Sequence, residues 1–91
     1  MRGLFSWDLY HQLPVVGILR GFDAADVVPM TAAAHRGGLR TIEVAMNTEG
    51  AEALIRQLRQ EFDETMNVGA GTVRDMDELA AALDAGAEFV V

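Results

Sequence analysis

Three short apolar runs, evenly spaced along the chain, constrain the fold most strongly. They are Val15–Leu19, Ile42–Met46 and Val68–Val73, and they begin about 26 residues apart. Each contains β-branched residues and is bounded by polar or glycine residues, which is typical of a buried strand. A fourth run, Phe89–Val91, stands at the end of the 91 residues.

Amphipathic helical patterns occupy the last two intervals between these runs. Apolar residues at spacings of three and four over 51–62 predict one helix, with arginines and glutamines on its other face. The same spacing of apolar residues recurs at Met76, Leu79, Ala80 and Leu83. Asp75 precedes this second helix as a typical N-cap, and Gly86 follows it as a typical stop.

The first interval is alanine-rich over 23–36 and also predicts a helix. Pro29 fits the first turn of a helix better than its interior, which favours a start near Asp26. A short leading helix is predicted over 7–12. Strands and helices therefore alternate, which indicates an α/β fold with parallel strands and right-handed crossovers.

A repeat of about 25 residues is one-eighth of a typical (β/α)8 TIM barrel. The chain holds three and a half to four such βα units and ends in the fourth strand. A complete domain seldom ends that way, because an apolar parallel strand would be left uncovered at an open edge. We therefore expect residues 1–91 to be a single partial domain, the N-terminal half of a (β/α)8 barrel.

Composition excludes several classes of function. Hydrophobic residues make up 51% of the chain and charged residues 23%, which indicates a soluble globular protein. A net charge of −7 argues against nucleic-acid and anionic-membrane partners. The chain has no cysteine, and His11 and His35 are isolated, so neither a metal nor a cofactor is expected. Residues 1–10 lack the apolar segment of a signal peptide, which favours a cytoplasmic location.

Glu43 is the most informative candidate for chemistry. Side chains alternate along a strand, so Glu43 shares a face with Thr41 and Ala45, opposite the large apolar residues. In a barrel the large apolar face packs on the helices, which places Glu43 inside. Burial would raise the pKa of its carboxyl toward the range useful for proton transfer. The alternatives are a solvated edge strand or an ion pair with Arg20 or Arg40.

Other polar residues stand at the ends of the predicted strands. Arg20 could hold a carboxylate or a phosphate, or pair with Glu43, and the two roles are compatible. Thr72 follows a glycine-rich run, and its hydroxyl could donate to an anion; close packing without a ligand would equally explain the glycines. Asn47 either joins this set or serves as a turn residue. Carboxyl ends of barrel strands are where barrel enzymes keep their sites.

The chain resembles the N-terminal half of the 2-keto-3-deoxy-6-phosphogluconate / 4-hydroxy-2-oxoglutarate aldolase family, including its 2-keto-3-deoxy-6-phosphogalactonate type. The segments that carry the resemblance are Pro14–Gly21, Gly37–Thr48, Val68–Val73 and Ala85–Val91. The resemblance implies a (β/α)8 barrel, a homotrimer and a class I aldolase that needs no metal. Its substrate would be a 2-keto-3-deoxy-6-phospho sugar acid, cleaved to pyruvate and glyceraldehyde 3-phosphate through a Schiff base on a lysine.

By the same resemblance, Glu43 would shuttle protons and Thr72 would help to bind the pyruvyl carboxylate. Arg20 matches an arginine that contacts substrate in phosphogalactonate-type relatives. Asn47 stands where many gluconate-type members carry arginine, which leaves the choice of substrate open.

The chain departs from the family in having no lysine, because all seven of its basic residues are arginines. The 91 residues alone are therefore expected to be inactive. Two other hypotheses about the function stay open. One is a half barrel that self-associates and has no catalytic function. The other is a barrel phosphosugar isomerase or epimerase that uses Glu43 as a base.

Overall fold

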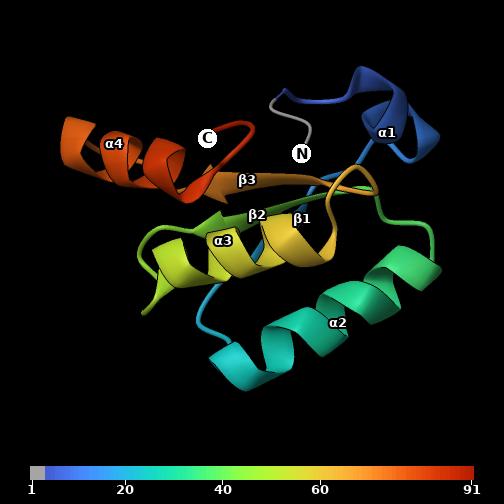
Figure 1. Ribbon diagram of the computed structural model, residues 1–91, viewed down its shortest axis with the longest axis horizontal. Coiled ribbons are helices and arrows are strands. Elements are labelled where there is room, and N and C mark those ends of the chain that lie inside the picture. The colour runs from blue at the N-terminus through green and yellow to red at the C-terminus, as the bar shows by residue number, and fades with distance from the viewer. Residues whose placement is uncertain (1–3) are drawn as a thin grey trace.

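A computed structural model describes residues 4–91 as alternating strands and helices (Figure 1). Residues 1–3, part of the segment on which the expectation of no signal peptide rested, lie outside the described residues. The strands are β1 (Gly17–Leu19), β2 (Thr41–Ala45) and β3 (Asn67–Gly71). The helices are α1 (Trp7–Gln12), α2 (Ala24–Arg36), α3 (Ala51–Glu61) and α4 (Met76–Ala85). The predicted α/β alternation is confirmed.

The three strands form one parallel sheet in the order β1-β2-β3. In its register Glu43 of β2 lies opposite Ile18 on one side and Gly69 on the other. The segment Phe89–Val91 runs beside β3 as a parallel bridge, with the Val91 amide donating to the Ala70 carbonyl at 2.9 Å. The fourth apolar run therefore continues the sheet in the parallel sense that the sequence predicted.

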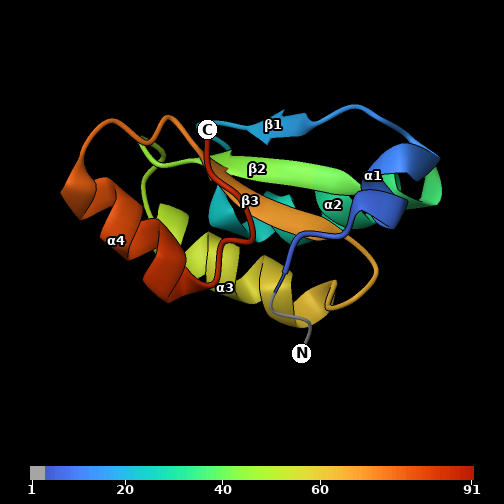
Figure 2. The ribbon, with the colours of Figure 1, turned by 90° about the horizontal axis from the view of Figure 1, so that it is seen from above.

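Helices α2 and α3 cover one face of the sheet, and α4 lies beside α3 (Figures 1 and 2). Ile42, Val44 and Val68 are buried on this face with the apolar stripe of α3, which consists of Leu54, Ile55 and Leu58. This burial of apolar surface is the main stabilising contribution to the fold. The opposite face of the sheet carries Thr41, Glu43, Gly69 and Gly71. We refer to it as the open face.

An aromatic cluster of Phe5, Trp7, Tyr10 and Phe89 lies on the open face. The Phe5 ring meets the Trp7 and Phe89 rings edge-on, with centroids 4.9 and 5.5 Å apart. Together with Val16 and Val91 these side chains line an apolar pocket. The segment from Phe5 through α1 thus covers the amino-terminal part of the open face.

Helix α2 begins at Ala24 and contains Pro29, so the expected start near Asp26 is wrong. An interior proline removes one backbone hydrogen bond from a helix. Pro29 is exposed, whereas Val27 is buried, and Val28 and Ala32 pack partly against the core. Packing of this apolar face outweighs the lost hydrogen bond.

Helix α4 has the predicted ends but a different buried face. The Asp75 side chain accepts a hydrogen bond from the Glu78 amide at 2.8 Å, and Gly86 ends the helix with φ of 99°. Met76 and Leu83, expected on the core side, are exposed, whereas Ala82 and Ala85 are buried. The small apolar residues of α4, rather than its larger ones, therefore face the core.

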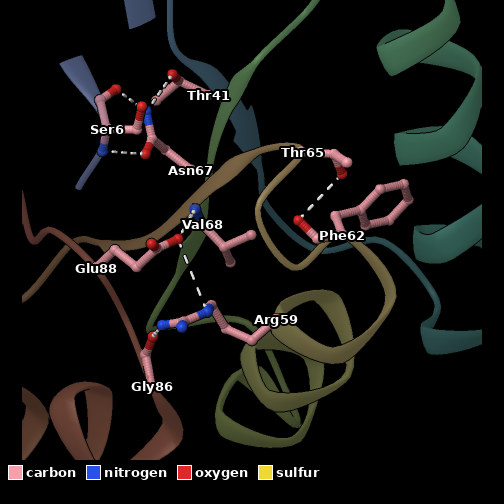
Figure 3. A network of polar contacts seen from close by, with 9 residues as sticks. All are labelled: Ser6, Thr41, Arg59, Phe62, Thr65, Asn67, Val68, Gly86 and Glu88. Atoms are coloured by element: carbon pink, nitrogen blue, oxygen red, sulfur yellow. Dashed lines mark hydrogen bonds and ion pairs between the residues drawn. The ribbon is translucent and has the colours of Figure 1, made fainter. Parts of the chain in front are cut away.

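Two polar networks join distant segments (Figure 3). The buried Asn67 side chain accepts from the Ser6 amide at 2.7 Å and donates to the Ser6 carbonyl at 2.9 Å. It also donates to the Thr41 hydroxyl at 3.2 Å. These bonds fasten the segment before α1 to the amino end of the sheet.

The second network joins α3 to the segment after α4. Glu88 Oε1 accepts from the Val68 amide at 3.0 Å and lies 3.7 Å from Arg59 Nε. The Arg59 guanidinium also donates to the Gly86 carbonyl. The Arg59 and Glu88 side chains are only 7% and 1% exposed, so removing either one leaves a buried charge.

Glu88→Ala should therefore lower the free energy of unfolding by about 3 kcal/mol, the cost of an uncompensated buried partner. Urea denaturation of the 91-residue chain measures this. Asp84→Ala is the matched control, because it removes the exposed partner of Arg56 and should cost less than about 1 kcal/mol. Equal effects of the two changes would contradict the assigned importance of the buried pair.

Candidate functional site

The candidate site lies at the carboxyl ends of the strands, where parallel strands bring their ends to the same edge of the sheet. Glu43 projects from β2, Arg20 follows β1 directly and Thr72 follows β3 directly. Three of the four predicted site residues are therefore gathered there by the parallel topology and register alone.

The Glu43 side chain is buried on the open face, with 6% of the residue exposed. Strand β2 is the central strand, so the alternative of a solvated edge strand is wrong. The proposed ion pair with Arg40 is also wrong, because the Arg40 guanidinium donates to Gln12 and to the carbonyls of His35 and Leu39.

Burial raises the pKa of the Glu43 carboxyl above its ordinary value of 4.5, and the positive charge of Arg20 partly opposes this. Desolvation is the larger of the two effects. The carboxyl can thus hold a proton at a higher pH than a solvated glutamate, which favours a role in proton transfer.

Arg20 and Thr72 are joined directly. Arg20 Nη2 donates to Thr72 Oγ1 at 2.8 Å, and the arginine is exposed. Thr72 has φ of 55°, in the left-handed region that β-branched residues rarely adopt. Such backbone strain is found disproportionately at ligand sites. The exposed guanidinium and the threonine hydroxyl together can bind a carboxylate or a phosphate.

Asn47 lies in the exposed turn after β2. Within residues 4–91, no hydrogen bond or ion pair joins it to the other three predicted residues. Its expected part in the site therefore stays a prediction.

Thr48 is a residue whose role the sequence reasoning missed. It is buried, and its Oγ1 accepts from the Gly21 amide at 3.1 Å. This bond links the loop after β1 to the loop after β2, next to Arg20. The two residues are 27 positions apart, so no local pattern in the sequence predicts their contact.

The described part of the chain contains no cluster of three His, Cys, Asp or Glu side chains that could hold a metal ion. Across residues 4–91, none of the helices combines the length and the apolarity needed to cross a bilayer.

Comparison with known proteins places the chain in a family. The family model described as "Aldolase: KDPG and KHG aldolase" matches residues 8–91, so the chain belongs to this family. A 2-dehydro-3-deoxy-phosphogluconate aldolase of Pseudoalteromonas atlantica is 37% identical over 86 residues, covering 94% of this chain and 40% of the relative. One from Pseudomonas aeruginosa is 43% identical over 79 residues, covering 87% and 34%.

A solved KDPG aldolase from Legionella pneumophila superposes with a TM-score of 0.81 at 27% identity, covering 90% of this chain and 39% of that one. That structure is described as holding pyruvate as a covalent carbinolamine intermediate captured at low pH. The present chain thus spans about two-fifths of the length of the curated relatives and solved structures that it matches.

The raised pKa of Glu43 makes stability depend on pH in a defined direction. The contribution of this group is fully present below about pH 4.5 and is lost as the pH rises through the raised pKa. The glutamine of the Glu43→Gln variant does not titrate. The free energy of unfolding of this variant, relative to that of the parent, should therefore increase from acidic to neutral pH. The expected gain is about 1.4 kcal/mol per unit of pKa difference between the folded and unfolded chains. Urea denaturation across this range measures the difference, and a pH-independent difference would contradict it.

Arg20→Gln should raise the pKa of Glu43 further, because the opposing positive charge is gone. Titration of the 13C-labelled Glu43 carboxyl by NMR measures the shift. Arg74→Gln is the control, because Arg74 is exposed and pairs with Glu78 at 2.9 Å. A shift of the same size in both variants would rule out a specific effect of Arg20.

Proposed function

We propose that this chain contributes the proton-transfer part of a class I aldolase site. The reaction is cleavage of a 2-keto-3-deoxy-6-phospho sugar acid to pyruvate and glyceraldehyde 3-phosphate. One observation carries the proposal: in a chain of the KDPG and KHG aldolase family, the carboxyl of Glu43 is buried at the carboxyl end of a parallel sheet and has a raised pKa.

In this proposal Glu43 acts as a general acid and base. Its protonated form supplies the proton with which the carbinolamine hydroxyl leaves as water. Its carboxylate form takes the proton of the substrate hydroxyl as the carbon–carbon bond breaks and leaves an enamine, and the acid then gives that proton to the enamine carbon, which becomes the methyl group of pyruvate. A raised pKa supports both directions of transfer, because the protonated form persists to a higher pH than in a solvated glutamate.

We propose that the substrate is bound by Arg20, Thr72 and Asn47. The Arg20 guanidinium and the Thr72 hydroxyl, joined at 2.8 Å, offer donors to an anionic group of the substrate next to Glu43. Asn47 is proposed as a substrate contact on the basis of its place after β2. Whether the substrate is of the gluconate or the galactonate type depends on these contacts.

The Schiff-base nitrogen is proposed to come from a lysine outside these residues, because the 91 residues contain none. The chain alone should therefore be inactive by this route. We further propose that the sheet is the first part, residues 1–91, of a (β/α)8 barrel, and that the protein acts as a cytoplasmic homotrimer. The parallel order of the strands and the family membership support the barrel, whereas the trimer and the location rest on the resemblance to the family alone.

The test is a chimera in which this chain replaces the matching segment of the Pseudomonas aeruginosa relative, which supplies the rest of the protein. The chimera should release pyruvate from 2-keto-3-deoxy-6-phosphogluconate or its galactonate epimer. Glu43→Gln should lower kcat at least ~100-fold, the low end for loss of a general acid or base. Glu52→Gln, an exposed carboxylate on α3, should leave kcat unchanged.

Borohydride reduction in the presence of pyruvate separates the proposal from the alternatives. A class I aldolase is trapped as a covalent adduct on its lysine. Absence of the adduct, together with interconversion of phosphosugars, would indicate an isomerase or epimerase. Near-normal aldolase activity in a folded Glu43→Gln chimera would contradict the role given to Glu43.

A further inference from the structure

Gly71, the last residue of β3, faces the Glu43 carboxyl on the open face. In the register of the sheet, Glu43 lies opposite Gly69 and Ala45 lies opposite Gly71. Residues 69 and 71 of β3 therefore share the face of Glu43. The Glu43 side chain leans toward the carboxyl end of the sheet and over Gly71, because the atoms closest to this glycine belong to the carboxyl group.

The space above Gly71 is filled by Glu43 itself. A β-carbon placed on Gly71 would lie 2.5 Å from Glu43 Oε1, 2.8 Å from Cδ and 3.3 Å from Oε2. The first two separations are shorter than any van der Waals contact permits. Any side chain at this position would therefore displace the carboxyl group.

The backbone of Gly71 does not itself require glycine. The glycines with positive φ among residues 4–91 are Gly21, Gly38, Gly50 and Gly86. Gly71 pairs with β2 as a regular strand residue, in a conformation that alanine adopts without strain. Space for the carboxyl, rather than backbone freedom, is what the missing side chain provides.

Gly69 offers a comparison within the same strand. A β-carbon there would meet the ring of Phe89 at 2.5 Å rather than Glu43. The two glycines of β3 thus accommodate different neighbours. Gly69 makes room for the aromatic cluster, and Gly71 makes room for the carboxylate.

We propose that Gly71 is a positioning residue for Glu43, which holds the carboxyl in its buried place beside Arg20 by leaving space for it. The catalytic meaning of this role rests on the proposed function, but the role itself does not. With a larger residue at 71, the carboxyl is displaced away from β3 and loses part of its present burial. The Glu43 carboxyl is then more exposed to solvent.

The experiment compares Gly71→Ala with Gly69→Ala in the 91-residue chain by NMR titration of the Glu43 carboxyl. Arg20 is the charged group that acts on Glu43, and both variants leave it in place. In Gly71→Ala the pKa of Glu43 should fall toward its ordinary value, because burial no longer raises it fully. In Gly69→Ala it should stay at the parent value. An unchanged pKa in Gly71→Ala, or equal shifts in both variants, overturns the proposal.

A second measurement keeps the test decisive if Gly71→Ala folds poorly. Gly71→Ala should lower the urea midpoint in the parent but leave it unchanged or raise it in a Glu43→Ala background, where the added methyl group has space. A fall of equal size in both backgrounds, or failure of the double variant to fold, overturns the proposal. Neither readout involves aldol chemistry, so failure of the aldolase assay and failure of this proposal are distinguishable.

Discussion

The burial of one carboxyl group in the middle strand of a parallel sheet is the constraint on which the site depends. Because β2 pairs with β1 on one side and β3 on the other, Glu43 has no free strand edge beside it. Its charged form is poorly solvated there, and Arg20 compensates only in part. The carboxyl therefore holds its proton to a higher pH than a solvated glutamate, and the stability of the fold falls as the pH rises through the raised pKa.

The loops that follow the three strands hold Arg20 near the Glu43 carboxyl. Thr48 holds the amide of Gly21, and Thr72 accepts from Arg20 while adopting a strained backbone conformation. The arginine is thereby held between two loops, close enough to act on Glu43 through its charge and exposed enough to meet a solute. Strand β2 thus fixes the position of the Glu43 carboxyl, and the loop after β1 carries the positive charge of Arg20.

Periodicity predicted most of the fold because each strand and helix carries its own local signal. The apolar stripe of α3, the Asp75 cap and the Gly86 stop were all predictable from short-range spacing. The buried face of α4 was not, because alanine packs well against a neighbouring helix although larger apolar residues lie nearby. The start of α2 was also missed, because tertiary packing of Val27 overrides the local preference of Pro29.

For the site, strand alternation was sufficient to place Glu43 on the open face, and strand ends were sufficient to bring Arg20 and Thr72 near it. Contacts across long stretches of sequence were beyond such reasoning. The bond between Gly21 and Thr48 and the close approach of Glu43 to Gly71 depend on the register of neighbouring strands. Register is a property of the assembled sheet, and no single segment encodes it.

The bonds between Ser6 and Asn67 join positions 61 residues apart. They form only after β3 has taken its place in the sheet, because Asn67 is the first residue of that strand. Closing so long a loop has an entropic cost that local helix formation does not. Helix α1 is therefore synthesised before the strand that holds its leading segment, and its aromatic side chains gain their cover on the sheet only when β3 is in place.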